Sequence, residues 1–377
     1  MRFKNFFVFI IFFLGVIFFC GFFNKKKSDS IYIGAVFPLS GDYYLSGHDV
    51  YNGVKFAFSK RQKILDKNLK LKIIDCSSDH IKNINAYNKL SSDQNICAII
   101  SGENSILSED IAAVSQKNPL PIILPTASLK SITEYGENIF RCAFIDETQG
   151  ECMANFALND LKAKTAAVFY DMDNQYSVTL AKSFSKVFKQ HGKILIEQMH
   201  PTDDNDYKIQ LNKIKFKNPD VLFVPDYEYN DVLIKKQAND IGIKSVILGG
   251  DTWEKVLNLT KNREAFDNIY FCTHYSAENP DSKIKNFVDE YKKIYKKAPN
   301  SFNALGFDAA NILIDAIQDA NSTDKDLVIK SLSKTNYSGI TGNIKFNSER
   351  NPDKDLTIIK ISNGKNNFFK TLKSDHE

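Results

Sequence analysis

Residues 33–53 read IGAVFPLSGDYYLSGHDVYNG, and this stretch determines how the fold begins. The apolar residues of Ile31–Phe37 predict a buried strand, which Pro38 and the Ser40–Gly41 turn bring to an end. The following segment, Asp49–Ser59, has the apolar period of a helix. A strand, a tight turn and a helix form the opening unit of a parallel sheet, and α/β proteins bind ligands in loops at the carboxyl ends of such strands. The loop between this strand and helix is therefore a candidate ligand site.

The same alternation continues along most of the chain. Short apolar runs predict strands at Ile31–Phe37, Leu69–Asp75, Cys97–Ser101, Pro121–Pro125, Ile139–Cys142, Thr165–Tyr170, Lys193–Met199, Val221–Val224, Val246–Gly249 and Ile269–Thr273. Amphipathic stretches predict helices at Asp49–Ser59, Ile81–Ser92, Ser108–Gln116, Thr148–Leu161, Tyr176–His191, Tyr207–Phe216, Asn230–Ile241, Asp281–Tyr295, Asn303–Ala320 and Lys325–Lys334. Strands that alternate with helices of this length indicate the α/β class. So many strands do not fit one compact sheet in 377 residues, so the pattern predicts two doubly wound parallel-sheet lobes.

The first residues have the features of an export signal. Arg2 and Lys4 precede the apolar run Phe6–Phe23, and the basic residues Lys25–Lys27 follow it. A short basic start before an apolar core directs a chain across a membrane. Segment 1–27 is therefore expected to be a signal or membrane anchor, with the chain from about Ser28 onward outside the inner membrane.

Two kinds of membrane attachment remain open. Cys20, near the end of the apolar run, suggests a lipoprotein in which this cysteine is acylated, although Phe19 stands where the processing site usually has a small residue. The run is also long enough to be a marginal transmembrane helix that stays uncleaved. The position of the cysteine at the end of a short apolar run favours the lipid anchor.

Composition excludes several classes of function. The formal net charge is +4, to which Arg2 and Lys4 contribute, and this is too small to indicate a nucleic-acid partner. The sequence contains no GxGxxG, P-loop, GxSxG or HExxH motif, and its six histidines have no metal-ligand spacing. Neither an enzyme, nor a cofactor, nor a metal site is therefore expected.

The cysteines beyond Cys20 have no CxxC spacing; they are Cys76, Cys97, Cys142, Cys152 and Cys272. Their number is odd, so at least one thiol stays free unless a partner chain supplies another. Disulfides are chemically allowed outside the cytoplasm, so a disulfide between Cys142 and Cys152 remains one of the alternatives. Most of these cysteines are expected to be small buried apolar residues.

Eight blocks of sequence, in order over roughly 280 residues, resemble the bacterial extracytoplasmic solute-binding proteins of the branched-chain amino-acid type. The blocks are PLSG (38–41), AIISG (98–102), LPIILPTAS (120–128), FRCAFIDETQGECMANF (140–156), AVFYDMDNQYSVTLAKSF (167–184), NPDVLFVPDYEYND (218–231), KQANDIGIKSVILGGDTW (236–253) and ALGFDAANIL (304–313). One block alone would fit many α/β proteins, but eight in the right order are far more specific.

The resemblance implies two lobes joined by a hinge of three chain crossings. The crossings are expected near Glu147, near Tyr275 and near Ser338–Thr341. The first lobe would comprise 29–147 plus 276–338, and the second would comprise 148–275 plus 339–377. The tail, Asn363–Glu377, has weak patterning and is expected to end in disorder.

In the first lobe, the resemblance implies ligand-binding roles for three hydroxyl-bearing residues, Ser105, Thr126 and Ser128. They follow two candidate strands, where hydroxyls and free backbone N–H groups near helix starts suit the carboxylate of an amino acid. The loop GENS around Ser105 is one residue shorter than the usual pattern. Ordinary turn or cap roles for Ser105 and Ser128 are the alternative.

In the second lobe, the resemblance implies that Asp251 faces the ligand ammonium and that Tyr176 and Tyr227 close over the ligand. An aspartate after two glycines can instead be a helix cap. Two residues depart from the family: Ser46 stands where some members carry a large aromatic, and Phe307 where a tyrosine is common. Both change the size and polarity of the pocket, so a preference for leucine does not carry over.

These features predict a binding protein that captures an amino acid or similar small polar ligand between two lobes and delivers it to the permease of an ABC importer. One alternative is a ligand-sensing receptor that regulates a separate signalling partner without transport. Another is a diverged relative that regulates an envelope enzyme and has lost its ligand site.

Overall fold

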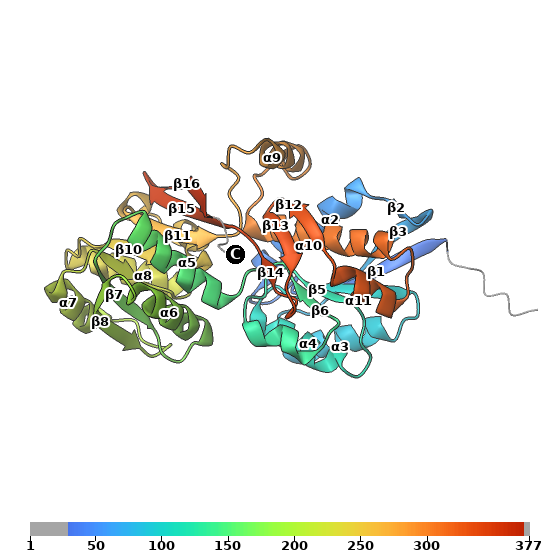
Figure 1. Cartoon of the computed structure of the whole chain (residues 1–377), viewed down its shortest axis with the longest axis horizontal. Helices are drawn as coiled ribbons and strands as arrows, with labels where there is room; N and C mark the ends of the chain where they lie inside the picture. Colours follow the sequence, from blue (N-terminus) through green and yellow to red (C-terminus); the bar gives the residue numbers. More distant parts are fainter. Residues whose placement is uncertain (1–28, 373–377) are drawn as a thin grey trace, which may run out of the picture.

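The computed structural model describes residues 29–372, which form two α/β lobes lying side by side (Figure 1). The predicted export segment, 1–27, and Cys20 lie outside the described residues. Each lobe is built on one mainly parallel sheet, which confirms the predicted two-lobed α/β fold. Nowhere in 29–372 is there a helix long and apolar enough to cross a membrane.

The sheet of the first lobe has the strand order β2-β3-β1-β4-β5-β6. Its strands are β1 (Ser30–Phe37), β2 (Lys63–Ile64), β3 (Lys67–Asp75), β4 (Ile96–Ser101), β5 (Ile122–Leu124) and β6 (Ile139–Arg141). Strand β1 pairs in parallel with β3 on one side and β4 on the other, so the direction of winding reverses between β1 and β4. The crevice at such a switch point is where doubly wound sheets bind ligands.

The sheet of the second lobe has the order β16-β15-β11-β10-β9-β7-β8. Its parallel strands are β7 (Thr165–Asp171), β8 (Lys193–His200), β9 (Val221–Phe223), β10 (Val246–Gly249) and β11 (Ile269–Thr273). Here the winding reverses between β7, which pairs with β8, and β9. Each predicted strand therefore exists within a few residues of its expected bounds.

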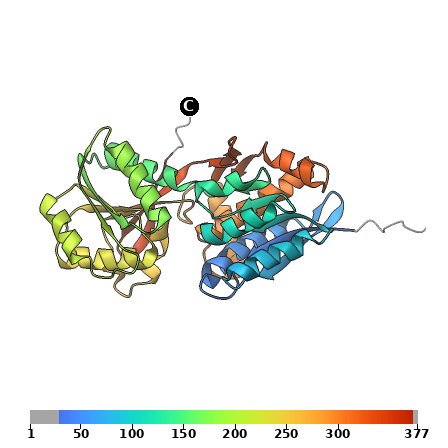
Figure 2. The same cartoon turned by 90° about the horizontal axis from the view of Figure 1, so that it is seen from below.

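Helices cover both faces of each sheet (Figure 2). In the first lobe, α2 (Tyr44–Lys60), α10 (Ser301–Asp319) and α11 (Lys325–Leu332) pack on one face, and α3 (His80–Ser91) and α4 (Ser105–Ser115) on the other. In the second lobe, α5 (Asp146–Asn159) and α6 (Gln175–Phe188) pack on one face, and α7 (Lys208–Lys217) and α8 (Glu228–Asp240) on the other. Helix α9 (Ser282–Tyr295) joins an aromatic cluster beside α2 and α10, and short 3-10 helices occur at η1 (Lys130–Tyr135), η2 (Asp251–Asn258) and η3 (Arg263–Ala265).

The C-terminal tail is ordered as a hairpin as far as Leu372, so the prediction of disorder is wrong for 363–372. Strands β15 (Leu356–Ser362) and β16 (Lys365–Leu372) pair antiparallel, and β15 pairs antiparallel with β11. The turn between them is Asn363–Gly364, with φ values of 53° and 66°. Asn-Gly with both residues at positive φ is the preferred two-residue hairpin turn, so the sequence carried a signal for this hairpin.

Two chain crossings between the lobes follow β6 and β11. After β6, Cys142 packs in the core of the first lobe, and Phe144 packs in the core of the second. Cys272, within β11, belongs to the second core, whereas Tyr275, two residues after the strand, packs in the aromatic cluster that contains Phe56 of the first lobe. The segments that connect the cores here are therefore only a few residues long.

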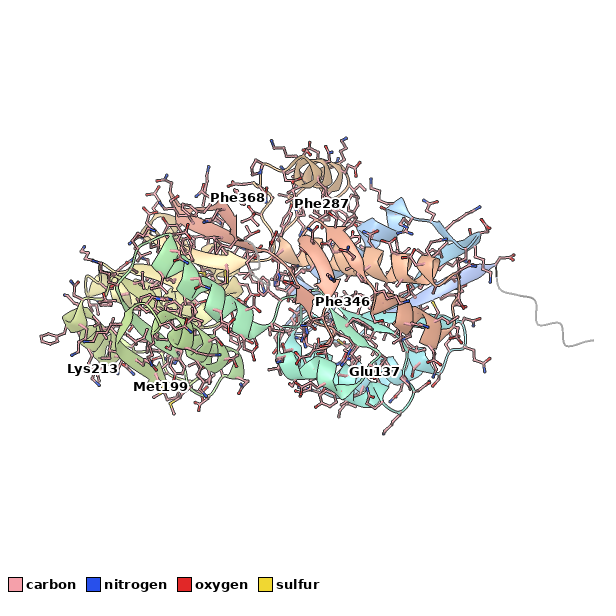
Figure 3. The ribbon with its side chains drawn as sticks, in the orientation of Figure 1. Glu137, Met199, Lys213, Phe287, Phe346 and Phe368 are labelled. Carbon is pink, nitrogen blue, oxygen red and sulfur yellow. The ribbon has the colours of Figure 1, made fainter. Side chains whose placement is uncertain are left out.

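The third crossing lies between Phe346 and Leu356, later than the expected Ser338–Thr341. Strands β12 (Asn336–Gly339), β13 (Gly342–Phe346) and β14 (Pro352–Asp353) form a separate small sheet. The alternating residues Ile344 and Phe346 are buried in the first core, where the Phe346 and Phe140 rings lie 5.1 Å apart. Figure 3 labels Phe346 on the first lobe. This packing holds β12 and β13 on the first lobe.

The five cysteines of the described chain are all free. Cys142 and Cys152 are therefore not bonded to each other; Cys142 packs in the first core and Cys152 against the second.

Candidate ligand-binding site

The three hydroxyl residues of the first lobe lie together at the carboxyl ends of β4 and β5. Ser105 opens α4, and its Oγ accepts hydrogen bonds from the backbone N–H groups of Ser128 (3.3 Å) and Leu129 (3.2 Å). The hydroxyl hydrogen of Ser105 is therefore free to donate to a ligand. Thr126 Oγ1 donates to the carbonyl oxygens of Gly102 (3.1 Å) and Glu103 (2.7 Å), so it ties the two loops together. Free N–H groups at the start of α4 and the Ser105 hydroxyl make this edge suited to a carboxylate.

The three predicted residues of the second lobe also lie together, at the carboxyl ends of β7, β9 and β10. Asp251 begins η2 directly after β10, and its Oδ1 accepts a hydrogen bond of 2.9 Å from the Tyr176 hydroxyl. The backbone N–H of Asp251 donates to Gln149 Oε1 at 3.0 Å. The rings of Tyr176 and Tyr227 lie 5.4 Å apart, and Tyr227 is 45% exposed. An acid held by a tyrosine and flanked by a second ring can receive an ammonium group.

Asp146, which we did not single out from the sequence, connects the two sets at the first crossing. Its side chain is 2% exposed, and its Oδ1 has no hydrogen-bond partner among the described residues. Burial raises the pKa of its carboxyl to about 7, and the nearby charge of Asp251 adds to the rise, whereas a hydrogen bond from Ser128 opposes it. The same carboxyl raises the pKa of the Tyr176 and Tyr227 hydroxyls, after burial as the main cause. In the sequence, Asp146 could have been found as an acidic residue of the family block at 140–156.

His274 supports Asp251 from the second crossing. Its Nε2 lies 3.7 Å from Asp251 Oδ2, and its ring stacks on Phe144 with centroids 3.6 Å apart. Burial lowers the pKa of the imidazole to about 4, so the ring is neutral at neutral pH. His274 also lines a cavity of about 300 Å³, together with Tyr275 of the second crossing and residues 338–343 of β12, β13 and their turn. The acid of the candidate site is therefore in contact with the hinge.

The two departures from the family have different surroundings. Ser46 is buried next to Glu103, and its hydroxyl donates to the carbonyl oxygen of Tyr43 at 3.1 Å. Phe307 packs in the aromatic cluster of the first lobe, 5.5 Å from Phe56 and 5.0 Å from Phe287. Ser46 is therefore packed beside the loop that carries Ser105, and Phe307 contributes an apolar wall to its own lobe.

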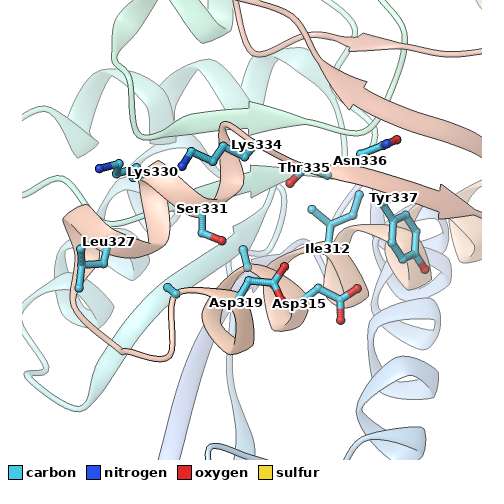
Figure 4. Close-up of a pocket in the computed structure, with 12 residues that line it drawn as sticks. Ile312, Asp315, Asp319, Leu327, Lys330, Ser331, Lys334, Thr335, Asn336 and Tyr337 are labelled. Carbon is cyan, nitrogen blue, oxygen red and sulfur yellow. The ribbon is translucent and has the colours of Figure 1, made fainter.

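A separate hollow of about 640 Å³ lies on the first lobe between α10, α11 and β12 (Figure 4). It is lined by carboxylates of Asp315 and Asp319 and by ammonium groups of Lys330 and Lys334. None of the six residues predicted to bind the ligand lines it. Because charges of both signs line this hollow, it is typical of a solvated surface and not of a ligand-binding site.

Two doubly wound lobes whose loops at the carboxyl ends of the strands carry complementary polar groups define a two-lobed ligand-binding protein. The chain belongs to the periplasmic binding protein family, whose model matches residues 30–366. This match confirms the resemblance to extracytoplasmic solute-binding proteins. The family consists of binding proteins, in agreement with the expectation that the chain is not an enzyme.

Solved structures and sequence relatives agree with this assignment. A leucine binding protein, LivK from Thermotoga maritima, is 29% identical with a TM-score of 0.81, covering 92% of this chain and 99% of that one. LivJ from Streptococcus pneumoniae, solved in complex with isoleucine, is 26% identical with a TM-score of 0.80, covering 90% and 99%. The Leu/Ile/Val-binding protein homolog 3 of Brucella melitensis is 25% identical over 322 residues, which are 82% of this chain and 84% of that protein.

Proposed function

We propose that this chain captures an amino acid between its two lobes and delivers it to an ABC importer. The carboxylate would bind at the start of α4 to the Ser105 hydroxyl and free N–H groups, next to Thr126 and Ser128. The ammonium would bind Asp251 on the second lobe, with Tyr176 and Tyr227 closing over the ligand. The relatives named for leucine or crystallised with isoleucine support an amino acid as the ligand class.

The observation that carries this proposal is the hydrogen bond between Tyr176 and Asp251 in the second lobe, which complements the hydroxyl set of the first lobe. It holds an acid in position at the end of β10, and Asp146 provides a second buried acceptor between the lobes. A zwitterion needs donors on one side and an acid on the other, and each lobe supplies one of these. Neither lobe alone provides both.

Replacement of the acid tests the proposal. Asp251→Asn keeps the shape of the side chain and removes its charge, so amino-acid binding should weaken by about 2–5 kcal/mol in calorimetry. Asp203→Asn changes an exposed aspartate of the same lobe and should leave the affinity unchanged. Equal affinity of Asp251→Asn and wild type would mean that the acid does not face a ligand ammonium.

We also propose that the protein works outside the inner membrane, held there by its N-terminal segment. The family and the signal-like sequence of 1–27 support this location. Uptake measurements separate transport from sensing. Removing the protein from the cell should lower uptake of the labelled amino acid that it binds, whereas a receptor that only senses would leave uptake unchanged.

A further inference from the structure

His200 and Asp226 form a buried pair in the second lobe, where His200 ends β8 and Asp226 lies in the loop after β9. His200 Nε2 lies 2.7 Å from Asp226 Oδ2, and both side chains are fully buried. Among residues 29–372, no other side chain forms an ion pair with Asp226. Because desolvation offsets much of the attraction within a buried pair, such a pair can serve to fix one arrangement of its neighbours.

The surroundings of the imidazole indicate that both of its nitrogens carry hydrogen. His200 Nδ1 lies 2.8 Å from the carbonyl oxygen of Pro201, which can only accept, so Nδ1 donates. The other nitrogen faces Asp226, whose Oδ1 accepts from the Tyr227 backbone N–H (2.7 Å) and the Asn230 side-chain amide (3.2 Å). Two donors on Oδ1 favour an ionised carboxyl, so the hydrogen between Nε2 and Oδ2 belongs to the ring. His200 is therefore an imidazolium.

Asp226 connects this imidazolium to two elements that carry proposed ligand-binding residues. Its side chain accepts from the N–H of Tyr227, directly before α8. Its backbone carbonyl accepts a hydrogen bond of 2.6 Å from the hydroxyl of Thr252 in η2, next to Asp251. Removal of either ring hydrogen would set an imidazole lone pair against an acceptor inside the protein. The loop would then have to move, and both contacts would move with it.

The other titratable groups around His200 favour its charged form or add no charge. Burial by itself would lower the pKa of the imidazole, but its two hydrogen bonds and the charges of Asp226 and Asp171 raise it above 6.5. Tyr207, directly before α7, has its ring centre 4.7 Å from that of His200, and burial raises the pKa of its hydroxyl. On α8, burial raises the pKa of the Asp231 carboxyl well above 3.8, which favours its neutral form.

We propose that His200 is a positioning residue for ligand binding, an imidazolium that holds Tyr227 and η2 in place through Asp226. Loss of its proton weakens binding of an amino acid. This inference rests on the proposed function, because Tyr227 and Asp251 bind the ligand only under that proposal. Since the pKa is higher in the folded protein than in the unfolded chain, the imidazolium is present at pH 6.5 and is lost as the pH rises through the folded value.

The charge on His200 is tested in the wild-type protein. Nuclear magnetic resonance of the full-length protein in detergent, with isotopically labelled histidine, distinguishes protonated from unprotonated ring nitrogens. Proximity to the Tyr207 ring identifies the signals of His200. We expect both of its nitrogens to be protonated at pH 6.5. A neutral His200 at this pH would overturn the inference and leave the proposed function standing.

Calorimetry measures the effect on binding, with the standard L-amino acid that most raises the melting temperature in a thermal-shift screen as the probe. At pH 6.5, His200→Gln should bind it roughly 10-fold more weakly than wild type, because a neutral amide replaces the buried cation. The ratio of the two affinities should fall as the pH rises, since wild type then loses the same charge. Titration of the probe's own ammonium affects both proteins equally. His191→Gln changes an exposed histidine of the same lobe and should leave the affinity unchanged.

Two outcomes of this measurement are decisive. If no standard amino acid binds, the proposed function fails and this inference fails with it. If wild type binds but the affinity ratio of wild type to His200→Gln stays constant between about pH 6 and 9, only the inference fails.

Two further variants test whether His200 acts through its neighbours. In a Tyr227→Ala background, His200→Gln should have a smaller effect on affinity than in wild type, and an equal effect would overturn the inference. Thr252→Val removes the hydrogen bond from η2 to the Asp226 carbonyl without touching His200, so it tests the same connection if His200→Gln does not fold. It should weaken binding roughly 3-fold or more, and wild-type affinity would contradict positioning through Asp226.

Discussion

Two titratable residues at the crossings between the lobes, Asp146 and His274, have pKa values displaced in the direction that favours their neutral forms. Burial raises the pKa of Asp146 from 3.8 to about 7 and lowers that of His274 from 6.5 to about 4. Both residues flank Asp251, so their protonation changes the charge that a ligand ammonium meets. Their effects on stability have opposite signs.

We predict opposite pH profiles for two variants at these positions. Folded Asp146 binds a proton that the unfolded chain releases between pH 4 and 7, so its contribution to stability falls as pH rises through this range. Folded His274 stays neutral where the unfolded chain is protonated, so its contribution rises between about pH 4 and 6.5. Each slope is at most about 1.4 kcal/mol per pH unit.

Urea titrations between pH 4.5 and 7.5 check this prediction. Relative to wild type, Asp146→Asn should gain stability as pH rises, and His274→Gln should gain stability as pH falls. Parallel curves for wild type and both variants would show that neither residue titrates differently in the folded protein.

At the scale of elements, helices α2 and α10 approach each other through glycines. A Cβ added to Gly53 would lie 2.0 Å from the carbonyl oxygen of Asn303, and one added to Gly306 would lie 2.3 Å from that of Val50. Both atoms that the added Cβ would meet belong to the backbone, which cannot avoid the collision by changing rotamer as a side chain can. The pair of helices therefore depends on glycine at these crossings.

We predict that Gly306→Ala destabilises the protein by about 1–3 kcal/mol, because it forces α10 away from α2. The better helix propensity of alanine, worth up to about 1 kcal/mol, is too small to offset the collision. Chemical denaturation measures the change, and Gln318→Ala on the exposed face of α10 is the control. A Gly306→Ala variant as stable as wild type would mean that the helices can separate at little cost.

At the scale of the whole molecule, the lobes touch beside the cleft as well as through the crossings. Glu254 of the second lobe accepts hydrogen bonds from the Ser301 hydroxyl (2.5 Å) and the Ser301 backbone N–H (3.2 Å) of the first. Thr273 also donates to Glu254, at 2.9 Å. These contacts join η2 of the second lobe to the start of α10 in the first. Because η2 also carries Asp251, the element proposed to bind the ligand also contacts the other lobe.

We predict that a saturating ligand lowers the radius of gyration in small-angle scattering, because a ligand held by both lobes favours the closed arrangement. Asp251→Asn at the same ligand concentration should keep the radius of the ligand-free protein. A wild-type radius that stays constant at saturation would contradict closure.

Attachment to the membrane is also a property of the whole chain, and it depends on residues outside the described range. If Cys20 is acylated, Cys20→Ser should release soluble protein on cell fractionation, because the lipid is the main attachment. Wild-type protein should also incorporate a fatty-acid probe. An unlabelled, uncleaved wild-type protein would instead indicate that Phe6–Phe23 stays as a membrane helix.

The order of strands and helices was determined by the sequence, since apolar periodicity depends on residues a few positions apart. The same local pattern places Ser105, Thr126, Tyr176, Tyr227 and Asp251 just after strand ends, where the residues of each lobe lie together; their role in ligand binding stays a prediction. Only the tertiary structure decided that the crossing after Phe346 comes late, because that depends on which core Ile344 and Phe346 fill.

Tertiary structure also decided the electrostatics of the cleft. Asp146 and His274 come from two segments far apart in the chain, and no short-range pattern indicates that both lie near Asp251. Their charges and pKa values depend on how deeply the lobes bury them and on which groups the opposite lobe presents. Burial and distance in three dimensions are set by packing, so the preference for a ligand has to be derived from the folded chain.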